Sequence, residues 1–97
     1  MVVRVAVIGL GRSANFHIKN LSASRKAEIV AVCDKDQDRE KKQSVILKCN
    51  GYTDLSRMVE TEEPDAAYVC TPPFARGEYE KLLAEAGVHL FLEKPIA

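Results

Sequence analysis

Residues 2–14 read VVRVAVIGLGRSA, and this stretch decides the fold. Its first half is almost continuously apolar and rich in β-branched residues, which predicts a strand over Val2–Ile8 that is buried on both faces. Apolar residues spaced among polar ones then predict a helix from Arg12 to about Ala23. A glycine turn of the pattern G-x-G-x-x-A therefore stands between a buried strand and a helix. This is the arrangement of the first βαβ unit of a dinucleotide-binding fold.

Three small residues of this turn have separate physical roles in such a fold. Gly9 permits the tight turn, Gly11 has no side chain that would block a pyrophosphate, and Ala14 allows close packing of helix against strand. The free N–H groups and the positive dipole end of the helix would face the phosphates, which makes Arg12 and Ser13 candidate cofactor-binding residues. A glycine-rich turn without a ligand has the same pattern, and Arg12 is equally explained as a solvated residue at a helix start.

Beyond residue 14, short apolar runs alternate with longer amphipathic stretches. Further strands are predicted at Ile29–Cys33, around Tyr52, at Ala66–Cys70 and at Val88–Leu92. A helix is predicted at Asp36–Cys49, with Val45, Ile46 and Cys49 on one face, and Asn50-Gly51 would end it. A short helix is predicted after a Thr53 cap, with Leu55, Met58 and Val59 on one face. A further helix is predicted at about Phe74–Ala86, where Gly87 would stop it. This alternation predicts an α/β fold, namely a doubly wound, Rossmann-like parallel sheet of about five strands in the order 3-2-1-4-5. Ligands of such a sheet bind at the carboxyl ends of the strands, near the switch between the first and fourth.

Asp34 follows the second predicted strand, where an acidic residue hydrogen-bonds the hydroxyls of the adenosine ribose. An acid that merely ends a strand is common, but its occurrence together with the glycine turn at this spacing predicts dinucleotide binding. A carboxylate here would repel a 2′-phosphate by on the order of a few kcal/mol, so NAD is expected over NADP. Lys35 weakens that argument, because its ammonium could swing toward such a phosphate.

Two proline-containing segments follow the later strands. Thr71-Pro72-Pro73 comes after the fourth predicted strand, across the cleft from the glycine turn, where its prolines would form a rigid wall. Glu93-Lys94-Pro95 comes after the fifth predicted strand, at a ligand-facing edge of the sheet. Lys94 there could hydrogen-bond a ribose hydroxyl or polarise a substrate oxygen. Taken alone, each segment is also explained as an ordinary break after a strand.

The composition is that of one ordinary globular domain of 97 residues. Lys plus Arg and Asp plus Glu number 14 each, which gives no electrostatic reason to expect nucleic acid or a membrane as a partner. Cys33, Cys49 and Cys70 lack metal-ligand spacing, so no metal site is expected, and the first and last are predicted to be buried. Val5–Ile8 is too short to span a membrane, and the expected location is cytoplasmic.

Over essentially all 97 residues, the sequence resembles the N-terminal domain of the glucose–fructose oxidoreductase, inositol dehydrogenase and rhizopine-catabolism (Gfo/Idh/MocA) family. The segments that carry the resemblance are Gly9-Leu10-Gly11-Arg12-Ser13-Ala14 with His17, Cys33-Asp34, Tyr52-Thr53-Asp54-Leu55, Pro64–Val69, Thr71-Pro72-Pro73, Ala86-Gly87-Val88-His89 and Glu93-Lys94-Pro95. The resemblance implies that the glycine turn holds the pyrophosphate, that Asp34 takes the adenosine ribose and that the Thr-Pro segment lines the cofactor cleft. It also implies that Glu93 and Lys94 lie at the cofactor, with Lys94 near the substrate as an active-site residue.

Two features depart from the family pattern. Arg76 stands about where the family often has a His, which puts that contact in doubt. Family members also continue into a second α+β domain that carries substrate-binding and usually acid–base residues, so residues 1–97 are expected to be a truncated dinucleotide-binding domain. Without the strand that the family adds, Val88–Leu92 is expected to be an exposed sheet edge through which the chain forms a homodimer.

The expected function is that of the cofactor-binding part of an oxidoreductase that uses NAD, with NADP as a second candidate. Hydride would pass between nicotinamide and a sugar, polyol or related small molecule, which would bind only with a second domain. An alternative is a stand-alone NAD(H) sensor or regulatory module, which the short length favours and Lys94 opposes. A third reading is an S-adenosylmethionine-binding Rossmann fold, whose turn usually has a third Gly where Ser13 stands.

Overall fold

Strands and helices alternate along the chain in the computed structural model, which describes residues 2–70 and 73–92. Within these ranges the strands are β1 (Val3–Ile8), β2 (Ala27–Cys33), β3 (Asn50–Tyr52), β4 (Ala66–Val69) and β5 (His89–Leu92). The helices are α1 (Arg12–Ala23), α2 (Gln37–Leu47), α3 (Leu55–Glu62) and α4 (Pro73–Glu85).

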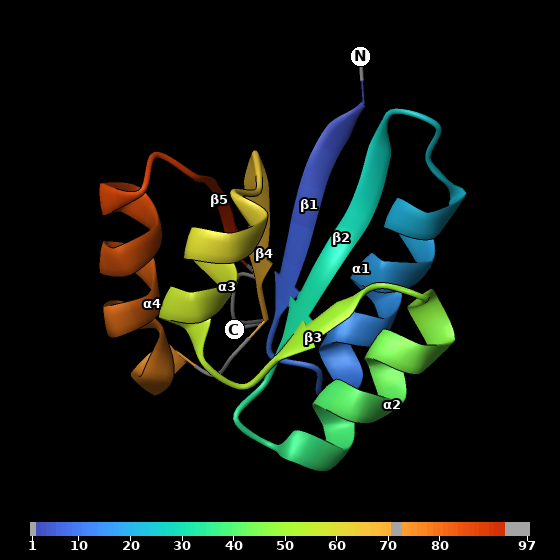
Figure 1. Cartoon of the computed structure of the whole chain (residues 1–97), viewed down its shortest axis with the longest axis horizontal. Helices are drawn as coiled ribbons and strands as arrows, with labels where there is room; N and C mark the ends of the chain where they lie inside the picture. Colours follow the sequence, from blue (N-terminus) through green and yellow to red (C-terminus); the bar gives the residue numbers. More distant parts are fainter. Residues whose placement is uncertain (1, 71–72, 93–97) are drawn as a thin grey trace.

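The strands pair in parallel in the order β3-β2-β1-β4-β5, which confirms the predicted fold class (Figure 1). The pairing register of β1 determines where its neighbours end. Ile8 pairs with Cys33 on one side and with Val69 on the other, so β1, β2 and β4 end level with one another. The segments that follow these three strands therefore meet at one edge of the sheet.

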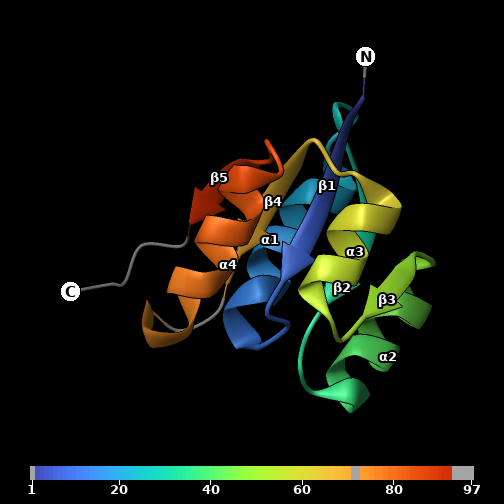
Figure 2. The ribbon, with the colours of Figure 1, turned by 60° about the vertical axis from the view of Figure 1, so that its left-hand side comes forward.

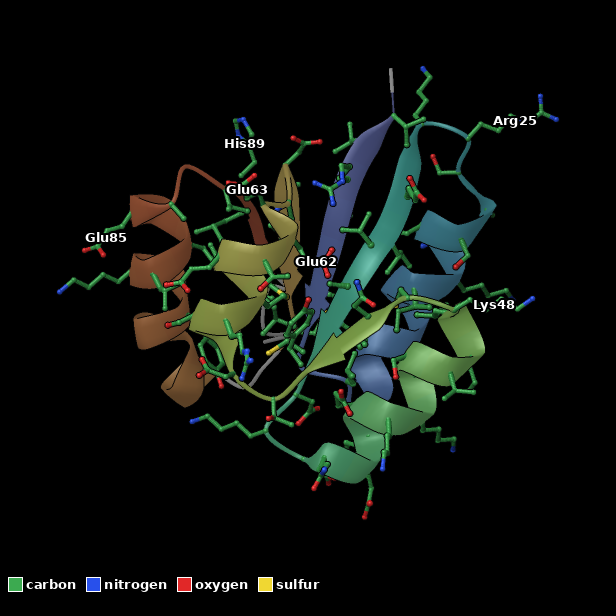
Figure 3. The ribbon with its side chains drawn as sticks, viewed as in Figure 1. Arg25, Lys48, Glu62, Glu63, Glu85 and His89 are labelled. Atoms are coloured by element: carbon green, nitrogen blue, oxygen red, sulfur yellow. The ribbon has the colours of Figure 1, made fainter. Side chains whose placement is uncertain are left out.

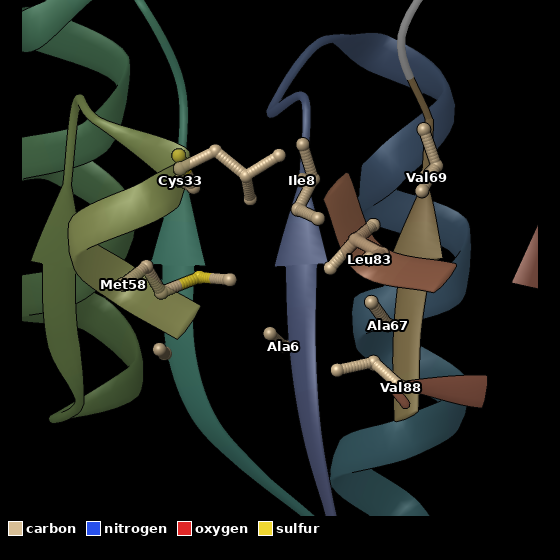
Figure 4. Packing of buried hydrophobic residues seen from close by; sticks show 10 residues of the cluster. Ala6, Ile8, Cys33, Met58, Ala67, Val69, Leu83 and Val88 are labelled. Atoms are coloured by element: carbon tan, nitrogen blue, oxygen red, sulfur yellow. The ribbon is translucent and has the colours of Figure 1, made fainter. Parts of the chain in front are cut away.

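The helices cover both faces of the sheet, as Figure 2 shows. Successive residues of β1 serve opposite faces, because side chains alternate along a strand. Ala6 and Ile8 belong to the core beneath α3 and α4, whereas Val5 and Val7 belong to the core beneath α1. In the first of these cores, Met58 of α3 lies over β2 and Leu83 of α4 lies beside β1 and β4, both without exposed surface (Figure 4).

The structure corrects the prediction for α2. The helix is shorter than predicted, because Asp36 is its N-cap and Lys48 takes the left-handed conformation with φ 54° at its C-cap. Val45 and Ile46, which were expected to form a buried face, are 74% and 61% exposed. The predicted helix end at Asn50-Gly51 is wrong, since these residues begin β3. Asn50 and Gly51 enter the sheet because they pair with β2. Val45 and Ile46 are left on the exposed side of α2.

The cap of α3 and the start of β2 also differ from the prediction. Asp54, not Thr53, caps α3, and its Oδ1 accepts hydrogen bonds from the backbone N–H groups of Ser56 and Arg57. A carboxylate satisfies these free N–H groups and favours the positive end of the helix dipole. β2 begins at Ala27 rather than Ile29, because its pairing with β1 already starts at Ala27, opposite Val3.

A buried carboxylate joins α3 to β1 and β3. The side chain of Glu62 lies between α3 and the sheet, where it is 8% exposed (Figure 3). Its Oε2 accepts hydrogen bonds of 2.6 Å from Asn50 Nδ2 and from the Tyr52 hydroxyl. Its Oε1 lies 3.7 Å from Nη2 of Arg4, and Arg4 Nη1 also donates to the Glu62 carbonyl at 2.6 Å. These contacts hold the end of α3 against two strands.

Candidate functional site

The glycine turn lies at the sheet edge where β1, β2 and β4 end. Gly9 has a φ of 83°, which L side chains rarely adopt, so glycine is required for the turn to leave β1 at this point. Its backbone N–H donates to the carbonyl of Cys33 at 2.8 Å, which ties the turn to the end of β2. Leu10 is buried, and its side chain belongs to the core beneath α1. The predicted role of Gly9 in the turn is confirmed.

The N-terminus of α1 is open on the side of Gly11. Gly11 is the N-cap residue, and no side chain caps the helix there, whereas α2 and α3 are each capped by an aspartate. A Cβ added at Gly11 would meet only Arg39 Nη1 within 4 Å, at 3.8 Å, among the described residues. Ala14 has no exposed surface, which agrees with close packing of α1 on the sheet. Arg12 and Ser13 form the first turn of α1, and their side chains lie outside the described part.

The carboxylate of Asp34 is fixed beside this turn. Its Oδ2 accepts a hydrogen bond of 2.7 Å from the backbone N–H of Leu10, and its Oδ1 accepts one of 2.8 Å from the N–H of Asp36. A carboxylate has about four lone-pair positions, so each oxygen can accept a further hydrogen bond. The sequence placed Asp34 at the end of the second strand, and the structure brings its carboxylate onto the glycine turn itself.

A pocket of about 280 Å³ lies next to Asp34, at the carboxyl ends of β2 and β3. Its lining combines apolar, hydroxyl-bearing and charged side chains: Cys33, Lys35, Thr53, Asp54, Leu55, Ser56, Tyr79 and Leu82. Lys35 Nζ lies 5.7 Å from the centre of the Tyr79 ring, within the range of a cation–π contact. Sequence reasoning did not predict this pocket, although the Tyr52-Thr53-Asp54-Leu55 segment after β3 borders it.

The cysteines near the site are poor nucleophiles. Burial, and then the negative charge of Asp34, raises the pKa of the Cys33 thiol to about 12. Burial, and then Glu62, raises the pKa of Cys49 to about 11. Cys33 and Cys70 are buried, as predicted. Among the described residues, no group of three or more His, Cys, Asp and Glu residues is placed to hold a metal ion.

Several predicted site residues cannot be placed. Thr71, Pro72, Glu93 and Lys94 lie outside the described residues, and Pro73 begins α4 with its side chain outside the described part. His89 is exposed on β5, in keeping with its predicted place in the sheet. No helix in residues 2–70 and 73–92 is long and apolar enough to cross a membrane.

Comparison with known proteins assigns the family. The model of the oxidoreductase family with an NAD-binding Rossmann fold (GFO_IDH_MocA) matches residues 3–97. The chain belongs to this family. The resemblance predicted from the glycine turn, Asp34 and the later segments is therefore confirmed.

The curated relatives that this chain matches are several times its length, and several of them are dehydrogenases. Myo-inositol 2-dehydrogenase of Thermotoga maritima is 33% identical over 97 residues, which is 98% of this chain and 29% of that protein. The chain thus spans less than a third of the length of this curated relative.

Solved structures of a dehydrogenase and a ketoreductase share the fold closely. The WlbA dehydrogenase of Bordetella pertussis, in complex with NADH and UDP-GlcNAcA, matches with a TM-score of 0.92 and 26% identity, over 100% of this chain and 30% of that one. A 3-ketoreductase from Actinomadura kijaniata, in complex with NADP, matches with a TM-score of 0.89 and 26% identity, over 98% of this chain and 31% of that one. Both nicotinamide dinucleotides thus occur among structures that share this fold.

Proposed function

We propose that this chain is the cofactor-binding domain of an NAD(P)-dependent oxidoreductase that acts on a sugar, polyol or related small molecule. The observation that carries the proposal is the 2.7 Å hydrogen bond from Leu10 N–H to Asp34 Oδ2. This hydrogen bond holds an acidic side chain against a glycine turn that opens a helix, and such an acid would bind the adenosine ribose. The inositol dehydrogenase among the relatives supports the substrate class.

Different described residues would contact different parts of the dinucleotide. Gly11 and the N-terminus of α1 would receive the pyrophosphate, because Gly11 has no capping side chain and, among the described residues, only Arg39 comes within 4 Å of a Cβ added there. Asp34 would accept hydrogen bonds from the adenosine ribose hydroxyls. The adjacent pocket lined by Leu55 and Tyr79 has apolar surface suited to the adenine ring. The nicotinamide ring of a bound dinucleotide would accept or donate the hydride.

The remaining site residues complete the proposal on the strength of the family pattern. Thr71, Pro72 and Pro73 would form the opposite wall of the cofactor cleft, and Glu93 would lie at its edge. Lys94 would hydrogen-bond a ribose hydroxyl or polarise the reacting oxygen of the substrate, so it is the catalytic candidate in this chain. Arg12 and Ser13 would lie against the phosphates.

Self-association and location complete the proposed picture. β5 pairs with β4 on one side, and no strand in the described residues pairs with its other side. An edge of this kind offers free N–H and C=O groups to another strand, so we propose that two copies associate through β5. The cytoplasmic location stays a prediction, in line with three free cysteines.

Calorimetric titration of the 97-residue chain with NADH tests the function directly. Binding with one dinucleotide per chain is expected, together with no turnover across a panel of sugars and polyols. Absence of NADH binding by the folded chain would overturn the proposal. Binding of NADH without any dehydrogenase activity in a longer form that includes a substrate domain would favour the sensor alternative.

A further inference from the structure

The N-cap residue of α2 contacts the carboxylate that is proposed to bind the ribose. Oδ1 of Asp36 accepts hydrogen bonds from the backbone N–H groups of Asp38, at 3.0 Å, and Arg39, at 3.3 Å. The carbonyl of Asp36 accepts the first bond of the helix, from the N–H of Glu40 at 3.1 Å. The N–H of Asp36 itself donates to Oδ1 of Asp34 at 2.8 Å. One residue therefore both closes the first turn of α2 and holds Asp34.

Two backbone N–H groups fix the carboxylate plane of Asp34, one at each oxygen. The N–H of Leu10 donates to Oδ2 from a turn that the Gly9 N–H ties to the end of β2. The N–H of Asp36 donates to Oδ1 from an exposed segment at the start of α2. The torsion that rotates a carboxylate has broad minima, so the loss of one donor lets the carboxylate plane turn. The donor in the exposed segment depends on what fixes that segment.

The helix that Asp36 caps is packed against the sheet farther along the chain. A Cβ added to Gly51 of β3 would lie 2.9 Å from the Cβ of Ser44, closer than Cβ contacts in real proteins, so α2 and β3 touch at this point. Residues 34–36 thus form a short connection between two packed elements, β2 and α2. A closed first turn of α2 fixes the end of this connection, and with it the direction of the Asp36 N–H.

We propose that Asp36 is a positioning residue, which by capping α2 holds the Asp34 carboxylate in the orientation that accepts hydrogen bonds from the adenosine ribose. The proposal rests on the proposed dinucleotide function. The role requires an oxygen at the N-cap, which serine supplies as well as aspartate does and alanine does not. It does not require the ion pair of Asp36 with Arg39, because both side chains are at least half exposed and such pairs contribute little to stability.

ADP and 2′-deoxy-ADP differ in one hydroxyl of the ribose. The ratio of their affinities therefore measures the hydrogen bond of that hydroxyl, whereas a loss of stability or a change of net charge affects both probes alike. Titration calorimetry gives this ratio for the wild-type chain and for Asp36→Ala, Asp36→Gly and Asp36→Ser. Glycine lacks the oxygen but is tolerated at N-caps, so Asp36→Gly is a second variant without the cap. Asp38→Ala is the matched control, since it removes the same charge from an exposed side chain in the first turn of α2.

The wild-type chain is expected to bind ADP about tenfold more tightly than 2′-deoxy-ADP, because a hydrogen bond from a hydroxyl to a carboxylate is charge-assisted. Asp36→Ala and Asp36→Gly should each reduce this ratio to about threefold or less. Asp36→Ser and Asp38→Ala should keep the ratio near the wild-type value.

A wild-type affinity ratio in Asp36→Ala and Asp36→Gly would overturn the proposal. An equally reduced ratio in Asp36→Ser would also overturn it, because the effect would then belong to the charge of Asp36 and not to its cap. So would an equal reduction in Asp38→Ala. A wild-type chain that binds NADH but does not distinguish ADP from 2′-deoxy-ADP would refute the ribose contact of Asp34, and with it this role of Asp36. Failure of the wild-type chain to bind NADH would instead refute the dinucleotide function itself.

Discussion

The Tyr52 hydroxyl donates a hydrogen bond of 2.6 Å to Oε2 of Glu62, across the contact between β3 and α3. Asn50 donates to the same oxygen, so one carboxylate serves both ends of the short strand β3. β3 lies at the edge of the sheet and has three residues, and it therefore depends on this contact for its position.

Glu62→Ala should destabilise the fold by about 2–3 kcal/mol, because it leaves the part-buried donors of Asn50 and Tyr52 without their acceptor and removes the ion-pair partner of Arg4. Urea unfolding followed by circular dichroism measures the loss. Glu60→Ala is the control, since Glu60 is an exposed residue of the same helix. Similar losses of unfolding free energy in Glu62→Ala and Glu60→Ala would show that the hydrogen bonds of Glu62 do not stabilise the fold.

Stability should fall as the pH rises above about 9. The folded-state pKa values of Cys33 and Cys49, about 12 and about 11, lie above the ordinary 9.0, and the pKa of Tyr52 is raised by burial and by Glu62. The unfolded chain therefore loses protons first, and stability is lost between about pH 9 and pH 12. Urea unfolding at pH 8 and pH 10 checks this. The Cys33→Ala variant should lose less unfolding free energy between pH 8 and pH 10 than the wild-type chain. An equal loss of unfolding free energy in both proteins would contradict the assignment to Cys33.

NADH should bind more tightly than NADPH, because the Asp34 carboxylate favours ribose hydroxyls and repels a 2′-phosphate. Asp34→Ala should narrow the difference by weakening NADH binding about tenfold. Titration calorimetry with both dinucleotides gives the ratio of the NADH and NADPH affinities. Thermal unfolding shows whether the loss of the Leu10 contact changes the stability of the fold. An unchanged ratio would mean that Asp34 does not contact the ribose.

Gly11→Val should abolish NADH binding and leave the fold intact. The φ of Gly11 is −76°, which valine adopts without strain, and a Cβ there has no protein atom closer than 3.8 Å among the described residues. The branched side chain would occupy the space for the pyrophosphate. A variant that melts at the wild-type temperature and still binds NADH would show that the phosphates lie elsewhere.

Association through β5 should respond to charge at its end. Leu92→Lys should weaken self-association, measured by light scattering across a range of concentrations, because a lysine on an edge strand opposes its pairing with another strand. Gln37→Lys, on the exposed start of α2, is the control. A wild-type chain that is monomeric at high concentration would rule out the edge as an interface.

The sheet could be predicted from sequence because its signals are local. β-branched residues mark β1 and β2, a short apolar run marks β4, and the glycine turn with Asp34 marks the edge that is proposed to bind the ligand. The outer face of α2 could not be predicted, since Val45 and Ile46 have the spacing of a buried face but are exposed. The pocket beside Asp34 and the reach of Arg39 to Gly11 depend on tertiary contacts between α2, α4 and the turns, which no local pattern encodes.

The central place of β1 has a consequence for synthesis on the ribosome. β1 is made before β2 and β4. β2 can pair with it early, but the other edge of β1 stays unpaired until residues 66–69 have been made. Until then Val5–Ile8 has free backbone groups along one side, and the cores on both faces are incomplete. Docking of β4 onto β1 joins residues far apart in the chain, so it should limit the folding rate. A nascent chain that stops before β4 is therefore the form most exposed to aggregation and chaperone capture.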